Sequence, residues 1–110
     1  MVQEIREINA AAAYERIQKG ALLLDIRETE EIEMLAFDVE EQIFIPQSEF
    51  AFRFSEILRD REVIVGCHSG NRSRDATLFL IKEKYDNVYN LKGGIEEWIE
   101  RGLPVRWDDY

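Results

Sequence analysis

The stretch VIVGCHSGNRSR, residues 63–74, gives the clearest sign of how this chain folds. A run of β-branched residues ends at Gly66, a short polar turn follows, and a segment with helical spacing begins near Arg72. The turn contains Cys67 and His68, the only cysteine and the only histidine of the 110 residues. A strand that enters a helix through such a turn is typical of a parallel α/β sheet, where ligands bind beyond the carboxyl ends of the strands.

Other short apolar runs are expected to complete the sheet. Their apolar residues are continuous and do not alternate with polar ones, which suits strands that are covered on both faces. The expected strands are residues 21–26, 43–45, 63–66 and 87–91, with a further short strand near 3–7. Because helical segments separate these runs, they predict an α/β fold with an open, mainly parallel sheet of about five strands.

Helical segments lie between and after the strands. Asn9 is a good N-cap for the first helix, Gly20 is a good residue to end it, and Ser48 is placed to cap the third. The expected helices are residues 10–19, 29–35, 49–58, 72–84 and 95–102. A chain of this length with this alternation predicts a single domain, residues 1–110, with helices on both faces of the sheet.

Composition limits the partners that the protein can bind. Fourteen basic and 23 acidic residues give a net charge of −9, which argues against binding to nucleic acid or to anionic membranes. No apolar run approaches the ~20 residues of a membrane helix, and the first residues lack an apolar signal core. We therefore expect a cytoplasmic protein. One cysteine and one histidine cannot form a disulfide or a typical zinc site within one chain, so we expect no metal and no cofactor.

The turn after the apolar run has the composition of a site built around sulfur. Gly70 permits unusual backbone angles, and the amides of residues 68–72 are expected to converge at the start of a helix as an anion-binding nest. Arg72 adds a cation with a planar set of donors. These surroundings favour the thiolate and predict that Cys67 is a nucleophile at the floor of an open bowl. The alternative, an inert buried cysteine, does not require the glycine, the arginine and the helix start.

The loop CHSGNRS, residues 67–73, resembles the active-site loop of the rhodanese (sulfurtransferase) family. Three further segments agree with that family in the same order: LLLDIRETEE, FIPQSEF and VYNLKGGIEEWIERGLPV, so that the resemblance spans about residues 21–105. It implies a rhodanese-like fold and a sulfurtransferase. Such an enzyme moves sulfane sulfur from a donor such as thiosulfate to a thiophilic acceptor such as cyanide or a thiol.

The resemblance also implies roles for individual residues. Cys67 would be the nucleophile and become a persulfide, and the loop amides would hold the outer sulfur. Arg72 would hold the turn and attract an anionic donor, while Ser69 and Ser73 would add hydroxyl donors. The loop residues implied to bind substrate are His68, Ser69, Gly70, Asn71, Arg72 and Ser73.

Several residues near the loop have two interpretations. His68 is interpreted as a rim or donor-recognition residue in preference to a general base. Asp25 and Arg27 are interpreted as a supporting ion pair that fixes the end of a strand, in preference to chemical groups. Gly93 and Gly94 are expected to form a tight turn near the site and not a ligand loop.

Two other functions remain open at this point. One is a non-catalytic rhodanese-like binding or regulatory module, against which the intact loop argues. The other is a phosphatase of the related branch of the fold. The loop from Cys67 to Arg72 has six residues, whereas the resemblance implies that a phosphatase needs a longer loop to surround a tetrahedral phosphate.

One segment departs from the family pattern. MLAFDVEEQIFIP, residues 34–46, lacks the Gly-His-Ile and Gly-Ala of many members, so one wall of the site is expected to differ. CHSG together with EEIEMLAF resembles members that are fused with or adjacent to adenylating enzymes. That likeness implies a sulfur-carrier protein, or a protein that donates a persulfide, as a partner.

Overall fold

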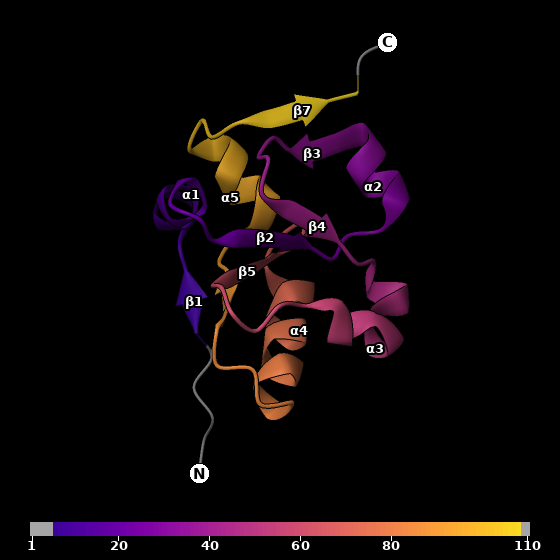
Figure 1. Ribbon diagram of the computed structural model, residues 1–110. Coiled ribbons are helices and arrows are strands. Elements are labelled where there is room, and N and C mark those ends of the chain that lie inside the picture. The colour runs from indigo at the N-terminus through magenta and orange to yellow at the C-terminus, as the bar shows by residue number, and fades with distance from the viewer. Residues whose placement is uncertain (1–5, 109–110) are drawn as a thin grey trace.

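The computed structural model describes residues 6–108, which form a five-stranded parallel sheet with helices on both faces (Figure 1). Along the chain its strands are β1 (Glu7–Ile8), β2 (Leu22–Asp25), β4 (Gln42–Phe44), β5 (Val63–Gly66) and β6 (Val88–Leu91). Their order in the sheet is β1-β6-β5-β2-β4, and every pairing is parallel. The expected α/β architecture is confirmed. Of the short strand expected near residues 3–7, residues 3–5 lie outside the described part.

A second, two-stranded sheet was not expected from the sequence. β3 (Leu35–Phe37) pairs antiparallel with β7 (Val105–Trp107) at one end of the molecule (Figure 1). Each strand has three residues, and the two are far apart in the sequence. Short runs of this kind carry too little periodicity to be recognised as strands.

Helices cover the two faces of the main sheet. They are α1 (Ala10–Gln18), α2 (Thr29–Met34), α3 (Phe50–Arg53), α4 (Asn71–Lys82) and α5 (Gly94–Glu100), with 3₁₀ turns at Gln47–Glu49 and Phe54–Glu56 on either side of α3. No helix within residues 6–108 is long and apolar enough to cross a membrane. The helices α1, α4 and α5 correspond closely to expected segments.

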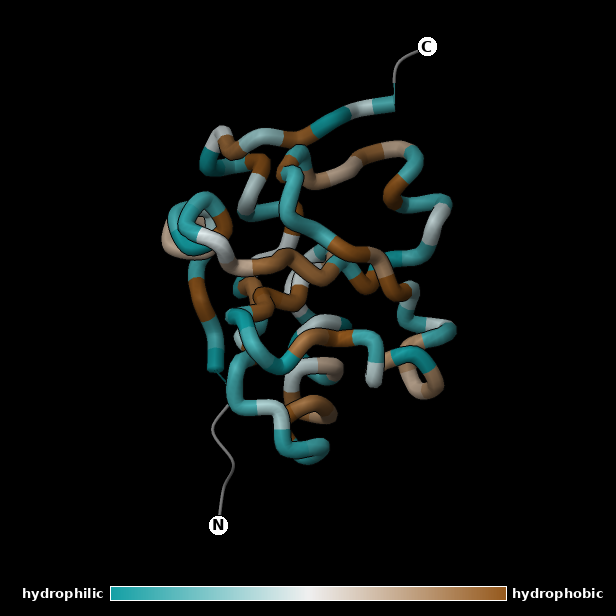
Figure 2. Tube along the Cα trace, viewed as in Figure 1, coloured by the Kyte–Doolittle hydropathy of each residue, from teal (hydrophilic) through white to brown (hydrophobic). Residues whose placement is uncertain are grey.

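Alternate residues of the central strands pack against opposite helical layers. Leu23 and Ile64 belong to the core beneath α1 and α5, whereas Leu24 and Val65 belong to the core beneath α3 and α4. Both faces are therefore buried, which explains the continuous apolar runs in the sequence. Figure 2 shows these runs as a brown centre surrounded by hydrophilic connections.

The ends of α1 agree with the sequence, whereas the start of the third helix does not. Asn9 accepts a hydrogen bond from the amide of Ala12 at 2.9 Å, and Gly20 follows the helix with a φ of +114°. Ser48 is not a helix cap, because it lies inside a 3₁₀ turn and donates its hydroxyl to Glu28 at 2.9 Å. The expected helix at 49–58 is therefore reduced to the short α3 between two 3₁₀ turns.

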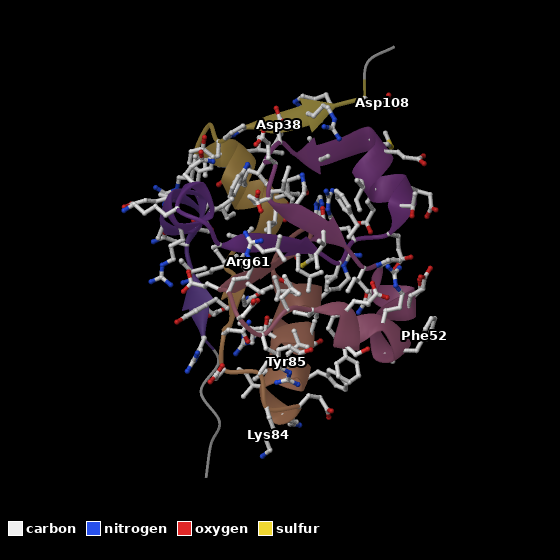
Figure 3. The ribbon with its side chains drawn as sticks, viewed as in Figure 1. Asp38, Phe52, Arg61, Lys84, Tyr85 and Asp108 are labelled. Carbon is white, nitrogen blue, oxygen red and sulfur yellow. The ribbon has the colours of Figure 1, made fainter. Side chains whose placement is uncertain are left out.

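The phenylalanines of this segment explain its irregular shape. Phe50 is 7% exposed and stacks edge-on with Phe79 of α4 at a centroid distance of 5.8 Å, and Phe54 does the same at 4.9 Å. Phe52, between them, is 74% exposed and points away from the core (Figure 3). The segment turns so that two of its three rings reach the core.

Candidate active site

Cys67 stands where the sequence places it, directly after β5 and before α4. Its predecessor Gly66 pairs with Asp25, the last residue of the neighbouring strand β2. A side chain at position 66 would be tight, because an added Cβ would lie 3.3 Å from the ring of Phe37. The loop therefore begins at the carboxyl ends of two adjacent parallel strands, which is the usual position of ligand sites in such sheets.

Backbone amides of the loop point at the sulfur atom. The amides of Gly70 and Ser73 donate to Cys67 Sγ at 3.1 and 3.3 Å, and Ser73 Oγ lies 3.3 Å from the same sulfur. Within residues 6–108, the other amides of the loop donate to no protein acceptor; they belong to His68, Ser69, Asn71 and Arg72. Of the amides of residues 68–72 that were expected to converge, the amide of Gly70 donates to the sulfur. The amide of Ser73, outside that range, donates to it as well.

The start of α5 fixes the direction of the loop peptides. The amides of Ile95 and Glu96 donate to the carbonyls of Cys67 at 2.9 Å and His68 at 3.1 Å. Since the carbonyl and the N–H of one peptide point in opposite directions, the N–H groups that follow these two carbonyls are turned away from α5. This contact between distant segments of the chain orients donors at the loop.

Glycine at position 94 makes that contact possible. Gly94 has a φ of +58°, and an added Cβ would lie 2.6 Å from Cys67 O and 2.5 Å from His68 O. Gly93 also has a positive φ, +81°. The expected tight turn near the site is confirmed, and the turn also brings α5 against the cysteine loop.

The sulfur is not at the floor of an open bowl. Cys67 is 0% exposed and belongs to the core cluster between the sheet, α3 and α4. That part of the expectation is wrong for this conformation, although the neighbouring amides do face the sulfur. A reagent reaches Sγ only if groups around the loop move.

Asp25 and Arg27 form the buried ion pair that the sequence suggested. Arg27 Nη2 lies 2.8 Å from Asp25 Oδ2, and the two side chains are 1% and 0% exposed. Arg27 Nη1 also donates to the carbonyl of Leu35 at 2.8 Å, which ties the end of β2 to β3. Both charges are therefore engaged within the protein.

Arg72 is held by a carboxylate that sequence reasoning did not identify. Its Nη1 and Nη2 donate to Glu31 of α2 at 2.8 and 2.6 Å in a bidentate contact. Hydrogen bonding from Arg72 lowers the pKa of Glu31 from 4.5 to about 2, and the same contact raises the pKa of Arg72. The only sequence sign of this partner was the acidic cluster after Asp25. Arg72 therefore joins the loop to α2 and is not an unpaired cation.

His68 lies at the exposed rim of the loop, near Glu96. Its Nε2 is 3.8 Å from Glu96 Oε2, and its side chain is 55% exposed. It lines a cavity of about 430 Å³ whose other residues are Arg27, Glu31, Met34, Leu35, Trp107 and Asp108. Met34 and Trp107 are strongly exposed there. Leu35 of β3 and Trp107 of β7 form part of this cavity, and Asp108, which follows β7, is labelled in Figure 3. That the 34–46 segment changes one wall relative to other members stays a prediction.

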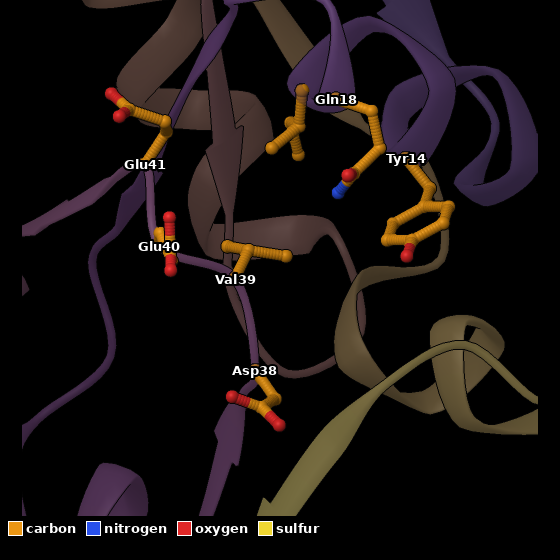
Figure 4. A pocket seen from close by; sticks show the side chains of 7 residues that line it. Tyr14, Gln18, Asp38, Val39, Glu40 and Glu41 are labelled. Carbon is orange, nitrogen blue, oxygen red and sulfur yellow. The ribbon is translucent and has the colours of Figure 1, made fainter.

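A second cavity, of about 340 Å³, lies away from the cysteine loop. It is bounded by Tyr14 and Gln18 of α1 and by Asp38–Glu41 in the β3–β4 connection (Figure 4). Its polar walls are mostly carboxylates, and none of the site residues predicted from the sequence lines it. Within residues 6–108, no group of three or more histidine, cysteine, aspartate or glutamate side chains is placed to hold a metal ion.

Asn90 of β6 is a buried polar residue beside the loop that sequence reasoning missed. It is 1% exposed. Its Oδ1 accepts from Ser73 Oγ at 2.5 Å, and its Nδ2 donates to Gly70 O at 3.2 Å and Glu7 Oε2 at 2.9 Å. Ser73 is itself fully buried, so the sulfur, the serine and the asparagine form one enclosed polar cluster.

Comparisons with known proteins agree with this geometry. The chain matches the family described as "Rhodanese-like domain" over residues 9–101. A sulfurtransferase of Allochromatium vinosum is 35% identical over 103 residues, which are 92% of this chain and 94% of that protein. The thiosulfate sulfurtransferase GlpE of Actinobacillus pleuropneumoniae is 35% identical over 107 residues, 96% of each chain. A solved structure of a rhodanese-related protein from Thermoplasma volcanium is 38% identical, covers 92% of this chain and 97% of its own, and superimposes with a TM-score of 0.79. The buried parallel sheet, the cysteine loop after its central strand and these matches together show that the chain belongs to the rhodanese-like domain family.

Proposed function

We propose that the protein takes sulfane sulfur from thiosulfate or a related donor, holds it as a persulfide on Cys67, and passes it to a thiophilic acceptor. That the protein is a sulfurtransferase follows from its family and from relatives 32–35% identical over most of their length. The observation that supports the persulfide step is the pair of amides directed at Sγ from Gly70 and Ser73. Donors aimed at a sulfur stabilise negative charge on it.

The proposed reaction has two displacements. The Cys67 thiolate attacks the outer sulfur of thiosulfate, the S–S bond of thiosulfate breaks, and sulfite leaves with the bonding electron pair. The enzyme is left as Cys67–S–S⁻. Cyanide or a thiolate then attacks the outer sulfur, and the Cys67 thiolate leaves. No external oxidant or reductant is needed, because the sulfur is transferred as a neutral atom between nucleophiles.

The loop offers donors for the outer sulfur as well. The amides of His68, Ser69, Asn71 and Arg72 have no acceptor within the described part of the chain. The start of α4, a helix of 12 residues, adds partial positive charge at the same place. We assign these amides to the persulfide anion, with the hydroxyl of Ser69 at the rim.

The charged residues support the loop in this proposal and do not recruit the donor. Arg72 holds the turn through Glu31, and Arg27 holds the end of β2 through Asp25. Access to the buried sulfur requires rim side chains to move. The side chains of Arg72, Glu31 and His68 are 31%, 34% and 55% exposed, so their movement displaces little packed surface.

The cavity beside His68 offers room for the acceptor. Its walls combine the apolar Met34 and Trp107 with the polar rim of the loop. It suits the organic part of a thiol, or the end of a sulfur-carrier or persulfide-donating protein. The choice among these belongs to experiment, because each presents a sulfur nucleophile or a sulfane sulfur to the same loop.

Mass spectrometry of the intact protein tests the proposal. After incubation with thiosulfate, the protein should gain one sulfur atom, and cyanide should remove it. Cys67→Ala should gain nothing while remaining folded by circular dichroism. A folded wild-type protein that gains no sulfur from thiosulfate or from an organic persulfide overturns the proposal. Hydrolysis of an aryl phosphate is not expected, because the loop from Cys67 to Arg72 has only six residues.

A further inference from the structure

The hydrogen bonds of Asn90 determine how its side-chain amide is oriented. Nδ2 contacts Glu7 Oε2 at 2.9 Å and Gly70 O at 3.2 Å. A carboxylate and a backbone carbonyl can only accept, so both contacts require the donor end of the amide. The reverse orientation would place Oδ1 against two acceptors in a buried site, which is costly. Oδ1 of Asn90 therefore faces Ser73.

That orientation determines where the hydroxyl hydrogen of Ser73 lies. Ser73 Oγ is 2.5 Å from Asn90 Oδ1, an atom that carries no hydrogen. The hydroxyl has one hydrogen, and this contact uses it. Ser73 Oγ also lies 3.3 Å from Cys67 Sγ, and on that side it presents lone pairs only. It can accept a hydrogen bond from an S–H group, and it opposes a charged sulfur.

We infer that Asn90 is a positioning residue that keeps Ser73 in the role of acceptor toward Cys67. The network then stabilises two states in which Sγ is uncharged. One is the thiol, which donates its hydrogen to Ser73. The other is the persulfide, in which the negative charge lies on the outer sulfur. The thiolate between them receives direct hydrogen bonds only from the amides of Gly70 and Ser73 among the described residues. The inference rests on Cys67 being the reacting residue of the proposed function.

Other charged groups also surround the sulfur, and most are paired. They are Glu7 of β1, Asp25 with Arg27 at the end of β2, Glu31 of α2 with Arg72 of α4, His68 of the loop near Glu96 of α5, and Arg74, Lys92 and Glu97, which line a pocket with Ser69, Gly70 and Asn71. None of these pairs includes Ser73 or Asn90 except the contact of Asn90 with Glu7. Replacing Ser73 or Asn90 by an uncharged residue removes none of these charges. Asn90→Leu also removes the contacts of Asn90 with Glu7 and with the carbonyl of Gly70, so its combination with Ser73→Ala is needed to isolate the effect of the hydroxyl.

Alkylation of Cys67 by iodoacetamide measures the effect without any sulfur donor. Its rate at pH 6 divided by its rate at pH 10 reports the fraction of thiolate, because changes in access affect both rates equally. Asn90→Leu releases the Ser73 hydrogen to donate to the sulfur, so this ratio should rise about tenfold, as expected for one hydrogen bond to a charged group. Ser73→Ala removes the lone pairs and should raise the ratio by a smaller factor.

Two further variants sharpen the test. Asn87→Leu is the matched control, because Asn87 likewise donates Nδ2 to backbone carbonyls but contacts neither the loop nor Ser73; its ratio should equal that of the wild type. In Asn90→Leu combined with Ser73→Ala, the ratio should fall back to that of Ser73→Ala, because Asn90 acts through the hydroxyl.

The direction in which the ratio of alkylation rates changes decides whether the inference holds. A lower ratio in Ser73→Ala means that the hydroxyl donates to the thiolate, and this result overturns the inference. An unchanged ratio in Asn90→Leu also overturns it. So does full additivity of the two substitutions in the double variant. If Asn90→Leu fails to fold, Ser73→Ala decides alone, since it keeps the backbone amide of residue 73. Uptake of sulfur from thiosulfate is measured separately, so the test of the proposed function does not depend on the result of the alkylation experiment.

Discussion

A single carboxylate, Glu31, links the cysteine loop to α2. It accepts both Nη atoms of Arg72 and also the backbone amide of Glu28 at 2.9 Å. These contacts lower the pKa of Glu31 from 4.5 to about 2. A residue with such partners contributes to the stability of the fold only while it is ionised.

We predict that Glu31→Gln lowers the free energy of unfolding by about 1 kcal/mol at neutral pH, since both partners are roughly one-third exposed and solvent screens their charges. The folded pKa is the lower one, so the contribution is complete above pH 4.5 and is lost as the pH falls toward 2. Urea unfolding of both proteins across this range measures it. A difference that persists unchanged at pH 2 contradicts the assignment.

The ion pair of Asp25 and Arg27 differs from the Glu31 contact because it is wholly buried. Removing one partner leaves an uncompensated charge, so Arg27→Met should cost about 3–5 kcal/mol in unfolding free energy. Replacing both, as Asp25→Leu with Arg27→Met, should recover much of that loss. Chemical denaturation of the three proteins provides the comparison. If the double variant is less stable than Arg27→Met, the pair contributes more to the free energy of unfolding than the compensation of one buried charge by the other.

Among the elements that are distant in sequence from the loop, α5 contacts it directly. Its first turn approaches the carbonyls of Cys67 and His68 through a glycine that leaves no room for a side chain. The helix is short, so its effect comes from this contact and not from its own stability.

Gly94→Ala should therefore cost about 3 kcal/mol in stability, from the strain of a positive φ and from the clash with two carbonyl oxygens. It should also slow the gain of sulfur from thiosulfate. Gly102→Ala is the matched control, because Gly102 has a φ of +71° and nothing within 4 Å of an added Cβ. Its cost should be about 1 kcal/mol, with normal sulfur uptake. Equal effects in the two variants would show that the approach of α5 is unimportant.

At the scale of the whole molecule, the net charge of −9 affects the approach of an anionic donor. Arg27 and Arg72 are paired with Asp25 and Glu31, so their charges offset little of the overall repulsion of thiosulfate. Salt screens such repulsion over distances of about 10 Å at 0.1 M ionic strength.

We predict that the second-order rate of sulfur uptake from thiosulfate rises about two- to threefold between low salt and 0.5 M sodium chloride. Alkylation by iodoacetamide, an uncharged reagent, should change little over the same range. Stopped-flow kinetics of both reactions supply the data. A thiosulfate rate that falls with salt would mean that Arg72 or His68 attracts the donor after all.

The sequence predicted those parts of the protein that depend on neighbouring residues. The strands around Leu23 and Ile64 are continuous apolar runs, and the loop from Cys67 is contiguous, so both could be recognised. The contacts of Asn90 and Gly94 join segments that are far apart along the chain, and no local sequence pattern predicts them. The burial of Cys67 was missed for the same reason, because packing by α3 and α4 determines it.

The contact between the loop and α5 also has a consequence for synthesis on the ribosome. Residues 67–73 leave the exit tunnel before residues 94–96, whose amides orient the loop peptides. In a nascent polypeptide, the amides of the loop therefore do not have their final orientation around the thiol until the start of α5 emerges. Translation order thus delays the final orientation of the loop peptides until the start of α5 is available to bind them.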